Sequence, residues 1–284
     1  FLLSVSTLGM ILMVSSADLV MLYLAIETTA IPLYIMAGFR INDQKSVEAG
    51  IKYFLYGAMT SAVMLFGFSL LFGFTGSTGL YAMAEILHQG QISTGLLILA
   101  LLLVLVGFGF KISAVPFHFW APDVYEGSPT PVAGFLSTAS KAAGFAVLIR
   151  VLLIVFSDIT PVWSSIVIVL SIASMVVGNL LALAQKNIKR LLAYSSIAQA
   201  GYMLIGVASG SSLGANAVTY YLLGYLVTNL AAFGIVSIIN RSIGSDEIAR
   251  YAGLNRRSPA LALGLLITML SLAGIPPFAG FIGK

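Results

Sequence analysis

The chain alternates between long apolar runs and short polar connections. The apolar runs lie at 2–16, 19–39, 51–74, 92–115, 130–156, 161–184, 190–208, 215–240 and 259–284. A helix needs about 20 apolar residues to cross a bilayer, and only a helix satisfies its own backbone in lipid. The pattern predicts an all-α integral membrane protein, a polytopic bundle of about nine transmembrane helices whose first and last members are cut short.

Basic residues gather in three connections, 40–52, 185–190 and 241–257. The alternating connections, around 75–91, 157–160 and 209–214, contain neither lysine nor arginine. Since helices cross alternately, the three basic connections fall on one side, and the positive-inside rule makes that side cytoplasmic, or its organellar equivalent. The net charge of +4 therefore reflects topology, and no nucleic-acid partner is expected.

The composition narrows the chemistry of the chain. Of its 284 residues, 59% are hydrophobic, 8% are charged and none is cysteine. Without cysteine the chain cannot hold a disulfide, a thiolate-bound iron–sulfur cluster or a Cys-linked haem. The two histidines, His88 and His118, are far apart, and no glycine-rich phosphate motif is present. No metal and no cofactor is expected in this chain.

Three charged residues lie deep inside predicted spans. Lys141 is about 16 Å into its helix and Glu27 about 12 Å, at 1.5 Å per residue, and Lys111 lies near the end of the 92–115 run. A buried carboxylate stays ionised only beside a cation, so Glu27 predicts a cationic partner, with Lys111 the best candidate. Two alternatives stay open: Glu27 is protonated and hydrogen-bonded, and Lys141 is paired only for packing. Arg150, nearer a helix end, is expected to reach the outer interface or to pair locally.

Prolines interrupt two of the spans. Pro116 follows Lys111 in one, whereas Pro276 and Pro277 precede Lys284 in the other. A proline inside a span frees a carbonyl and breaks the helix, and irregular backbone at membrane depth is tolerated where it lines a cavity. We therefore expect two broken helices with lysines beside them.

The two broken spans are five apart in order, so they cross the membrane in opposite directions. Interrupted helices in opposite orientation are typical of inverted repeats. The predicted division is a first five-helix repeat, 1–156, and a second inverted repeat, 161–284, truncated at its C-terminal end. The seventh span has no carboxylate to match Glu27, so the two repeats differ in chemistry. Since buried lysines can gain and lose protons near neutral pH, Glu27, Lys111, Lys141 and Lys284 form a candidate proton pathway.

Three long segments resemble a known family. They are "KISAVPFHFWAPDVYEGSPTPVAGFLSTASKAAGF", "NIKRLLAYSSIAQAGYMLIG" and "SLAGIPPFAGFIGK", and they are similar to the antiporter-like membrane subunits of respiratory complex I, the proton-translocating NADH:quinone oxidoreductase. Relatives among the cation/proton antiporters carry "H-[SA]-A-T-M-V" and "DAMxxPTPVS", where this chain has "STASKAAG" and "DVYEGSPTPV". These differences favour the N type of subunit (mitochondrial subunit 2) over a stand-alone antiporter.

The resemblance implies roles for the buried residues. Glu27 would pair with Lys111, Lys141 would be the central lysine, and Lys284 the terminal lysine at the outlet. NADH, FMN, iron–sulfur clusters and quinone would be bound by partner subunits, and the chain would contact other membrane subunits and the lipid bilayer. His118 is either a proton relay to Lys111 or an interfacial histidine hydrogen-bonded to a loop.

Three other interpretations stay open. The chain is a subunit of a multi-subunit cation/proton antiporter, the equivalent subunit of a photosynthetic type I dehydrogenase, or a structural segment in which buried charges only hold helices in register. Trp120 and Trp163 are expected as interfacial anchors, and Asp123 and Glu126 as residues of a solvated or subunit-contacting loop.

Overall fold

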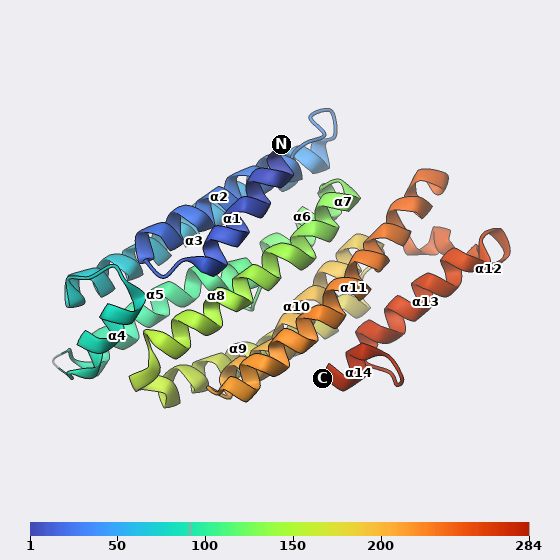
Figure 1. Ribbon diagram of the computed structural model, residues 1–284. Coiled ribbons are helices and arrows are strands. Elements are labelled where there is room, and N and C mark those ends of the chain that lie inside the picture. The colour runs from blue at the N-terminus through green and yellow to red at the C-terminus, as the bar shows by residue number, and fades with distance from the viewer. Residues whose placement is uncertain (91, 284) are drawn as a thin grey trace.

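The computed structural model describes residues 1–90 and 92–283, and within them the protein is a bundle of roughly parallel and antiparallel helices (Figure 1). The N-terminal helices α1, α2 and α3 lie at one side, α13 lies at the other, and α8 and α10 run between them. The first half contains α1 (Leu2–Ser15), α2 (Leu19–Ala37), α3 (Gln44–Thr75), α4 (Leu80–His88), α5 (Thr94–Ile112), α6 (Trp120–Gly127), α7 (Thr130–Phe135), the π-helical turn η1 (Leu136–Ser140) and α8 (Lys141–Ile154).

The second half follows after a short 3₁₀ turn. It contains η2 (Ser157–Ile159), α9 (Thr160–Leu183), α10 (Ile188–Ala208), α11 (Ser212–Ile243), the 3₁₀ turn η3 (Ile248–Tyr251), α12 (Leu254–Arg257), α13 (Pro259–Ala273) and α14 (Ala279–Gly283). Seven helical stretches of the described chain are long and apolar enough to cross a membrane, and α1 and α13 are shorter apolar helices. The predicted all-α membrane architecture is confirmed.

Most helix boundaries fall within three residues of the predicted spans. The exception is α3, which begins at Gln44 although its apolar run begins at Ile51. Its polar first turns are capped by Asp43, whose carboxylate accepts from the backbone N–H of Lys45 at 3.0 Å. Three short helices, α4, α6 and α12, occur in segments that the sequence pattern assigned to connections.

Both interrupted helices are present. Helix α5 ends at Ile112 and resumes as α6, and α13 ends at Ala273 before α14. Each first segment ends on a residue in the left-handed region, Ser113 at φ 58° and Gly274 at φ 80°. The prolines follow these residues, and each break thus begins before its proline.

Helices α2 and α10 run in opposite directions. The backbone N–H of Leu19, at the start of α2, donates to Thr78 beyond the end of α3 (2.8 Å). Arg190, at the start of α10, contacts Asp123 (2.5 Å), which also binds Lys52 near the start of α3 (2.6 Å). Since α2 begins at the end of the bundle where α3 finishes and α10 begins where α3 starts, the two helices are antiparallel.

Several local features occur once in each half. Asp18 and Asn187 cap the starts of α2 and α10 through their side chains, and each forms an isolated backbone bridge, with Gly79 and Glu247 respectively. Helices α3 and α11 have 32 residues each, and both end on a glycine in the left-handed conformation. These features fit inverted repeats, and the boundaries 1–156 and 161–284 stay a prediction.

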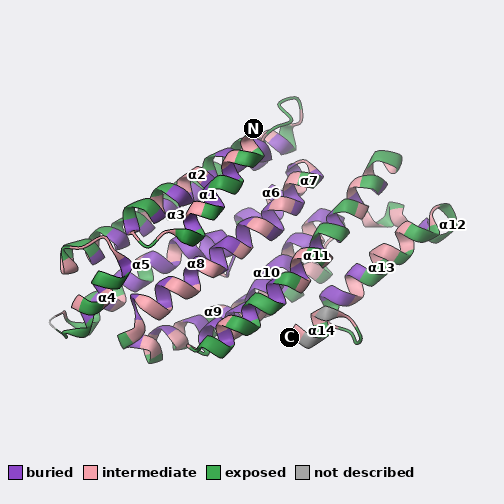
Figure 2. Ribbon diagram, in the orientation of Figure 1, coloured by how far each residue is buried: buried purple, intermediate pink, exposed green. Residues whose placement is uncertain are grey.

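Buried residues line the middle of the bundle, on α5, α8 and α10, whereas exposed residues cover the outer faces of α3 and α11 (Figure 2). Many of those exposed residues are large and apolar, as expected for lipid contact. The prediction for the tryptophans is wrong: Trp120 and Trp163 are 2% and 0% exposed. Each indole N–H instead donates to a backbone carbonyl where a helix ends, that of Phe110 and that of Phe156, both at 3.0 Å.

Candidate proton-transfer site

The first helix break exposes backbone groups that other segments satisfy. The backbone N–H of Ser113 and the Trp120 indole N–H both donate to the carbonyl of Phe110, at 3.1 and 3.0 Å. The backbone N–H of Val115 donates to the Ser174 hydroxyl at 2.9 Å. The Ser113 hydroxyl is fully buried and has no hydrogen-bond partner among the described residues. The break is therefore held from several helices and keeps a polar group available for water.

Glu27 and Lys111 face one small cavity beside this break. The cavity measures about 10 Å³, close to the space that one water molecule needs, and Tyr34, Thr60 and Ser61 also line it. Glu27 accepts a hydrogen bond from Ser61. Lys111 is 6% exposed, and its ammonium lies 3.5 Å from the carbonyl of Ile26.

The predicted direct pair between Glu27 and Lys111 is not formed in this structure, since no ion pair joins them within the described residues. The Ser61 hydroxyl donates to the Glu27 carboxylate, and the Lys111 ammonium donates to the Ile26 carbonyl. The two side chains nevertheless line one cavity with room for about one water molecule. Their charges therefore interact through a medium of low polarity, where attraction is stronger than at a surface.

Lys141 forms a second buried site. Its ammonium is 0% exposed and donates to the Ser196 carbonyl at 2.9 Å and to the Ser196 hydroxyl. The π-helical turn Leu136–Ser140 comes directly before it, and such turns inside α-helices are frequent at functional sites. No carboxylate contacts Lys141 in the described part of the chain, so this lysine is held by hydroxyl and carbonyl oxygens alone.

Hydroxyl groups surround the Lys141 site. The Tyr125 hydroxyl lies 3.4 Å from Ser196 Oγ, and the Tyr225 hydroxyl is a second phenol close to Ser196. Asn229 donates to Tyr225 at 3.0 Å and to the Ser137 hydroxyl at 2.6 Å. The cluster joins α6, η1, α10 and α11 around one buried cation.

The two sites are adjacent along the bundle. A side chain at Gly144, one turn after Lys141, would meet the Lys111 Cβ atom at 3.5 Å and the Ile112 Cγ2 atom at 3.1 Å. The glycine thus lets α8 pack closely on the end of α5, at the helix break. Lys111 therefore lies at the contact between α5 and α8, and Lys141 lies one turn away from it on α8.

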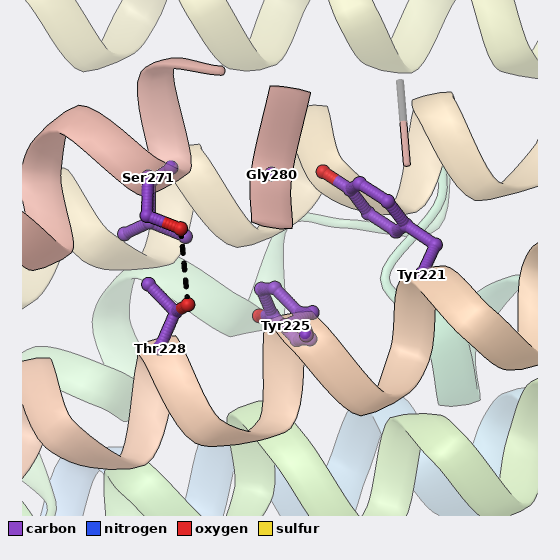
Figure 3. Close-up of a pocket in the computed structure, with 7 residues that line it drawn as sticks. Tyr221, Tyr225, Thr228, Ser271 and Gly280 are labelled. Atoms are coloured by element: carbon purple, nitrogen blue, oxygen red, sulfur yellow. Dashed lines mark hydrogen bonds between the residues drawn. The ribbon is translucent and has the colours of Figure 1, made fainter. Parts of the chain in front are cut away.

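A second small cavity lies beside the second break. It is about 10 Å³ in volume and is lined by residues of α11, α13 and α14, including Tyr225, Thr228 and Ser271 (Figure 3). The Thr228 and Ser271 hydroxyls are 3.1 Å apart. Lys284 lies outside the described residues, so its place beside Pro276 and Pro277 stays a prediction.

Equivalent positions in the two halves carry different groups. Ser196 lies nine residues after the cap Asn187, as Glu27 lies nine residues after Asp18. The hydroxyl that holds Lys141 therefore occupies the place of the carboxylate that faces Lys111. Leu272 takes the place of Lys111, two residues before the left-handed residue that ends its helix.

An ion-pair cluster fixes α6 at the end of the bundle where the basic connections lie. Asp123 binds Lys52 (2.6 Å) and Arg190 (2.5 Å), while Glu126 binds Lys45 (2.8 Å) and Arg190 (3.0 Å). The two acids thus lie in a helix and pair within the chain, whereas the sequence predicted a solvated or subunit-contacting loop. The cluster ties the second segment of the broken helix to α3 and α10.

The electrostatics of the two acids follow from these contacts. Partial burial alone would raise the pKa of Asp123, but the hydrogen bonds from Lys52 and Arg190 outweigh it and hold its pKa below the ordinary value. Burial likewise raises the pKa of Glu126, and its bonds to Lys45 and Arg190 bring the net pKa below the usual range. Both carboxylates are therefore ionised at neutral pH.

Two further ionisable residues are buried. Lys189, assigned to a basic connection, is 4% exposed, because it donates to the Ser128 carbonyl at 3.1 Å and pairs with Asp246 at 3.2 Å. His118 is buried at the break, with its ring 4.5 Å from that of Phe119 and Nδ1 unpartnered within the described residues. Hydropathy places a residue along a span but does not show which neighbours cover it.

Arg150 contacts a helix end as the sequence allowed. Its guanidinium donates to the carbonyl of Val14 at 2.7 Å, near the end of α1. The charge is satisfied at the periphery and is not part of the buried lysine sites.

Interrupted helices in opposite orientation, with a lysine and a glutamate facing a cavity at one break, define an antiporter-like membrane protein. The chain belongs to the NADH:quinone oxidoreductase/Mrp antiporter transmembrane family, whose model matches residues 16–284. It is thus a multi-pass membrane protein.

Three relatives show the range of the similarity. The chain is 52% identical over 283 residues to NADH-quinone oxidoreductase subunit N of Moorella thermoacetica, covering 100% of this chain and 59% of the relative. A chain of respiratory complex I from Thermus thermophilus is 43% identical with a TM-score of 0.84, covering 99% of this chain and 60% of that one. A chain of the Mrp complex from Dietzia sp. is 25% identical with a TM-score of 0.90, covering 99% and 52%. The chain therefore spans less than two thirds of the length of these relatives.

Proposed function

We propose that this chain is the proton-translocating part of an N-type membrane subunit of NADH:quinone oxidoreductase, respiratory complex I. The observation that carries the proposal is the pair of adjacent buried sites, Glu27 with Lys111 at the first break and Lys141 beside it. Ionisable groups are costly inside a membrane, and where they occur they mark ion or proton pathways. The higher identity to complex I chains than to the Mrp chain supports this function over a cation/proton antiporter.

The mechanism depends on the charge interaction between Glu27 and Lys111. When their separation across the shared cavity decreases, attraction stabilises the ammonium form of Lys111, and when it increases, Lys111 releases its proton. Moving one charge through 100 mV requires about 2.3 kcal/mol, and changes of a few kcal/mol are expected for charges at low effective dielectric.

The released proton passes to Lys141 on the facing helix. Ser196 accepts hydrogen bonds from this lysine in place of a carboxylate, so no anion among the described residues contacts Lys141 and would retain the proton. The next acceptor in the proposed pathway is Lys284, beyond the second break. His118, buried at the first break, is a candidate entry group for Lys111.

The electrons follow a path outside this chain in the proposed complex. NADH, FMN, iron–sulfur clusters and quinone are assigned to partner subunits, because the chain has no cysteine and no group of three His, Cys, Asp or Glu residues in its described part is arranged to hold a metal. Other membrane subunits of the complex and the lipid bilayer are the proposed partners. The end of the bundle with the basic connections 40–52, 185–190 and 241–257 is proposed to face the cytoplasm or its organellar equivalent.

Purified complex in sealed vesicles tests the proposal. Proton movement should require NADH and a quinone, and the partners should be identified as complex I subunits by mass spectrometry. Proton exchange driven by a sodium or potassium gradient, without NADH or quinone, would instead establish an antiporter. Electron entry from reduced ferredoxin but not NADH would assign the chain to a photosynthetic type I dehydrogenase.

A further inference from the structure

Tyr225 connects two polar features of the described structure. Its side chain is buried in α11, its hydroxyl accepts a hydrogen bond from Asn229 at 3.0 Å, and Ser196 lies close to it. Ser196 is the residue that holds the Lys141 ammonium. A phenol hydroxyl can donate one hydrogen bond while it accepts others, so Tyr225 is part of the Lys141 cluster.

The same tyrosine lines the cavity beside the second helix break (Figure 3). Thr228 and Ser271 face each other across this cavity with their hydroxyls 3.1 Å apart. Its volume of about 10 Å³ accommodates about one water molecule, and the hydroxyls supply the polar partners that a buried water needs. Tyr225 therefore stands between the Lys141 cluster and a site suited to one water.

Comparison of the two halves shows what the second cavity lacks. Thr228 lies 17 residues after the cap Ser211, as Thr60 lies 17 residues after Asp43, so the two cavities occupy equivalent places. The first cavity is lined by Glu27 and Lys111, whereas no described residue lining the second is charged. A proton that enters the second cavity must come from elsewhere, and the neighbouring hydroxyls of Tyr225 and Ser196 lead toward Lys141.

We propose that Tyr225 is a proton-relay residue that, with Ser196 and one water molecule in the second cavity, carries protons between Lys141 and the second helix break. The inference rests on the proposed function. In one transfer the Lys141 ammonium loses a proton to Ser196, Ser196 passes one to Tyr225, and Tyr225 passes one to the water. Each hydroxyl gains one proton and releases another, so both end unchanged, and no oxidant or reductant takes part.

The test replaces Tyr225 by phenylalanine in the assembled complex and measures the rate of NADH-driven proton pumping. The ring that packs in the core is kept and only the hydroxyl is lost. Because a positioned proton-transfer group contributes 10²-fold or more and water can replace part of it, we expect pumping to fall at least about tenfold. Lys141→Met in the same preparation should fall similarly. Tyr53→Phe is the matched control, since Tyr53 is equally buried but lines neither cavity, and its pumping should equal that of wild type.

A fluorinated tyrosine at Tyr225 separates relay from packing. The substituted phenol keeps its ring and hydroxyl but is a stronger acid, so a relay role predicts a shifted pH profile of pumping, while a packing role predicts none. Wild-type pumping in Tyr225→Phe together with its loss in Lys141→Met would overturn the relay and leave the proposed function intact. Wild-type pumping in Lys141→Met would contradict the proposed function itself. If Tyr225→Phe does not assemble, an unshifted profile in the fluorinated variant overturns the relay.

Discussion

Replacement of Lys141 by methionine separates a transport role from a packing role. The structure gives opposing contributions to stability. The variant loses two hydrogen bonds from an ammonium group to Ser196, each contributing about 1.5–3 kcal/mol. It also relieves the burial of an ammonium at 0% exposure, which costs several kcal/mol when no counter-ion is present. Methionine fills a similar volume with apolar atoms, so we expect stability to be unchanged or to rise by about 2 kcal/mol.

The assay compares two properties of the same purified complex. The temperature at which helical circular dichroism is lost in detergent should be equal to or above that of wild type, while NADH-driven proton pumping should be lost. Lys189→Met is the matched control, because Lys189 is as deeply buried but pairs with Asp246. Its removal leaves that carboxylate with Asn240 as its remaining side-chain partner, and should lower the unfolding temperature. Strong destabilisation of Lys141→Met with normal pumping would instead make Lys141 a packing residue with no role in transport.

Two further predictions concern the packing of the described helices. Asp123 and Glu126 have pKa values below their ordinary range, so their ion pairs contribute full stability above the ordinary carboxyl pKa of about 4 and lose it as pH falls through the depressed values. The unfolding temperature should therefore be level from pH 7 to 5 and fall in stronger acid. An equal decline in the Asp123→Asn variant would contradict a role for the Asp123 ion pairs. Gly178→Val would place a Cβ atom 2.6 Å from the backbone nitrogen of Ala198, where no side chain can move aside. The overpacking should destabilise the fold by about 1–3 kcal/mol, and native gels should show less assembled complex. Gly234→Ala, with open space around it, should assemble normally.

The sequence predicts the membrane architecture well because the signals are strong. A run of about 20 apolar residues has few alternatives to a membrane helix, and Pro116 and Pro276 mark the two breaks because proline cannot continue the backbone hydrogen bonding. The charged residues Lys111 and Lys141 stand out for the same reason, since each conflicts with the apolar residues around it.

The details that depend on three-dimensional neighbours could not be predicted. Sequence spacing gives Glu27 a cationic partner but cannot show that Ser61 binds its carboxylate. Ser196 is an ordinary polar residue in sequence, and its importance follows only from the contact with Lys141 and from its register with Glu27. The prominence of Tyr225 likewise depends on a cavity formed by three helices. The sequence did contain one signal for the register between Ser196 and Glu27. It is the pair of cap residues Asp18 and Asn187, because counting from them aligns the two halves.

Passage of protons through Lys111 is the central step of the proposed function, and it is tested by the number of protons moved per NADH oxidised by the Lys111→Ala complex in sealed vesicles. Assembly is checked beforehand by native gel electrophoresis. We expect fewer protons per NADH than in wild type, because Glu27 then faces a cavity without the Lys111 ammonium. A wild-type ratio at the wild-type rate, in fully assembled complex, would contradict it.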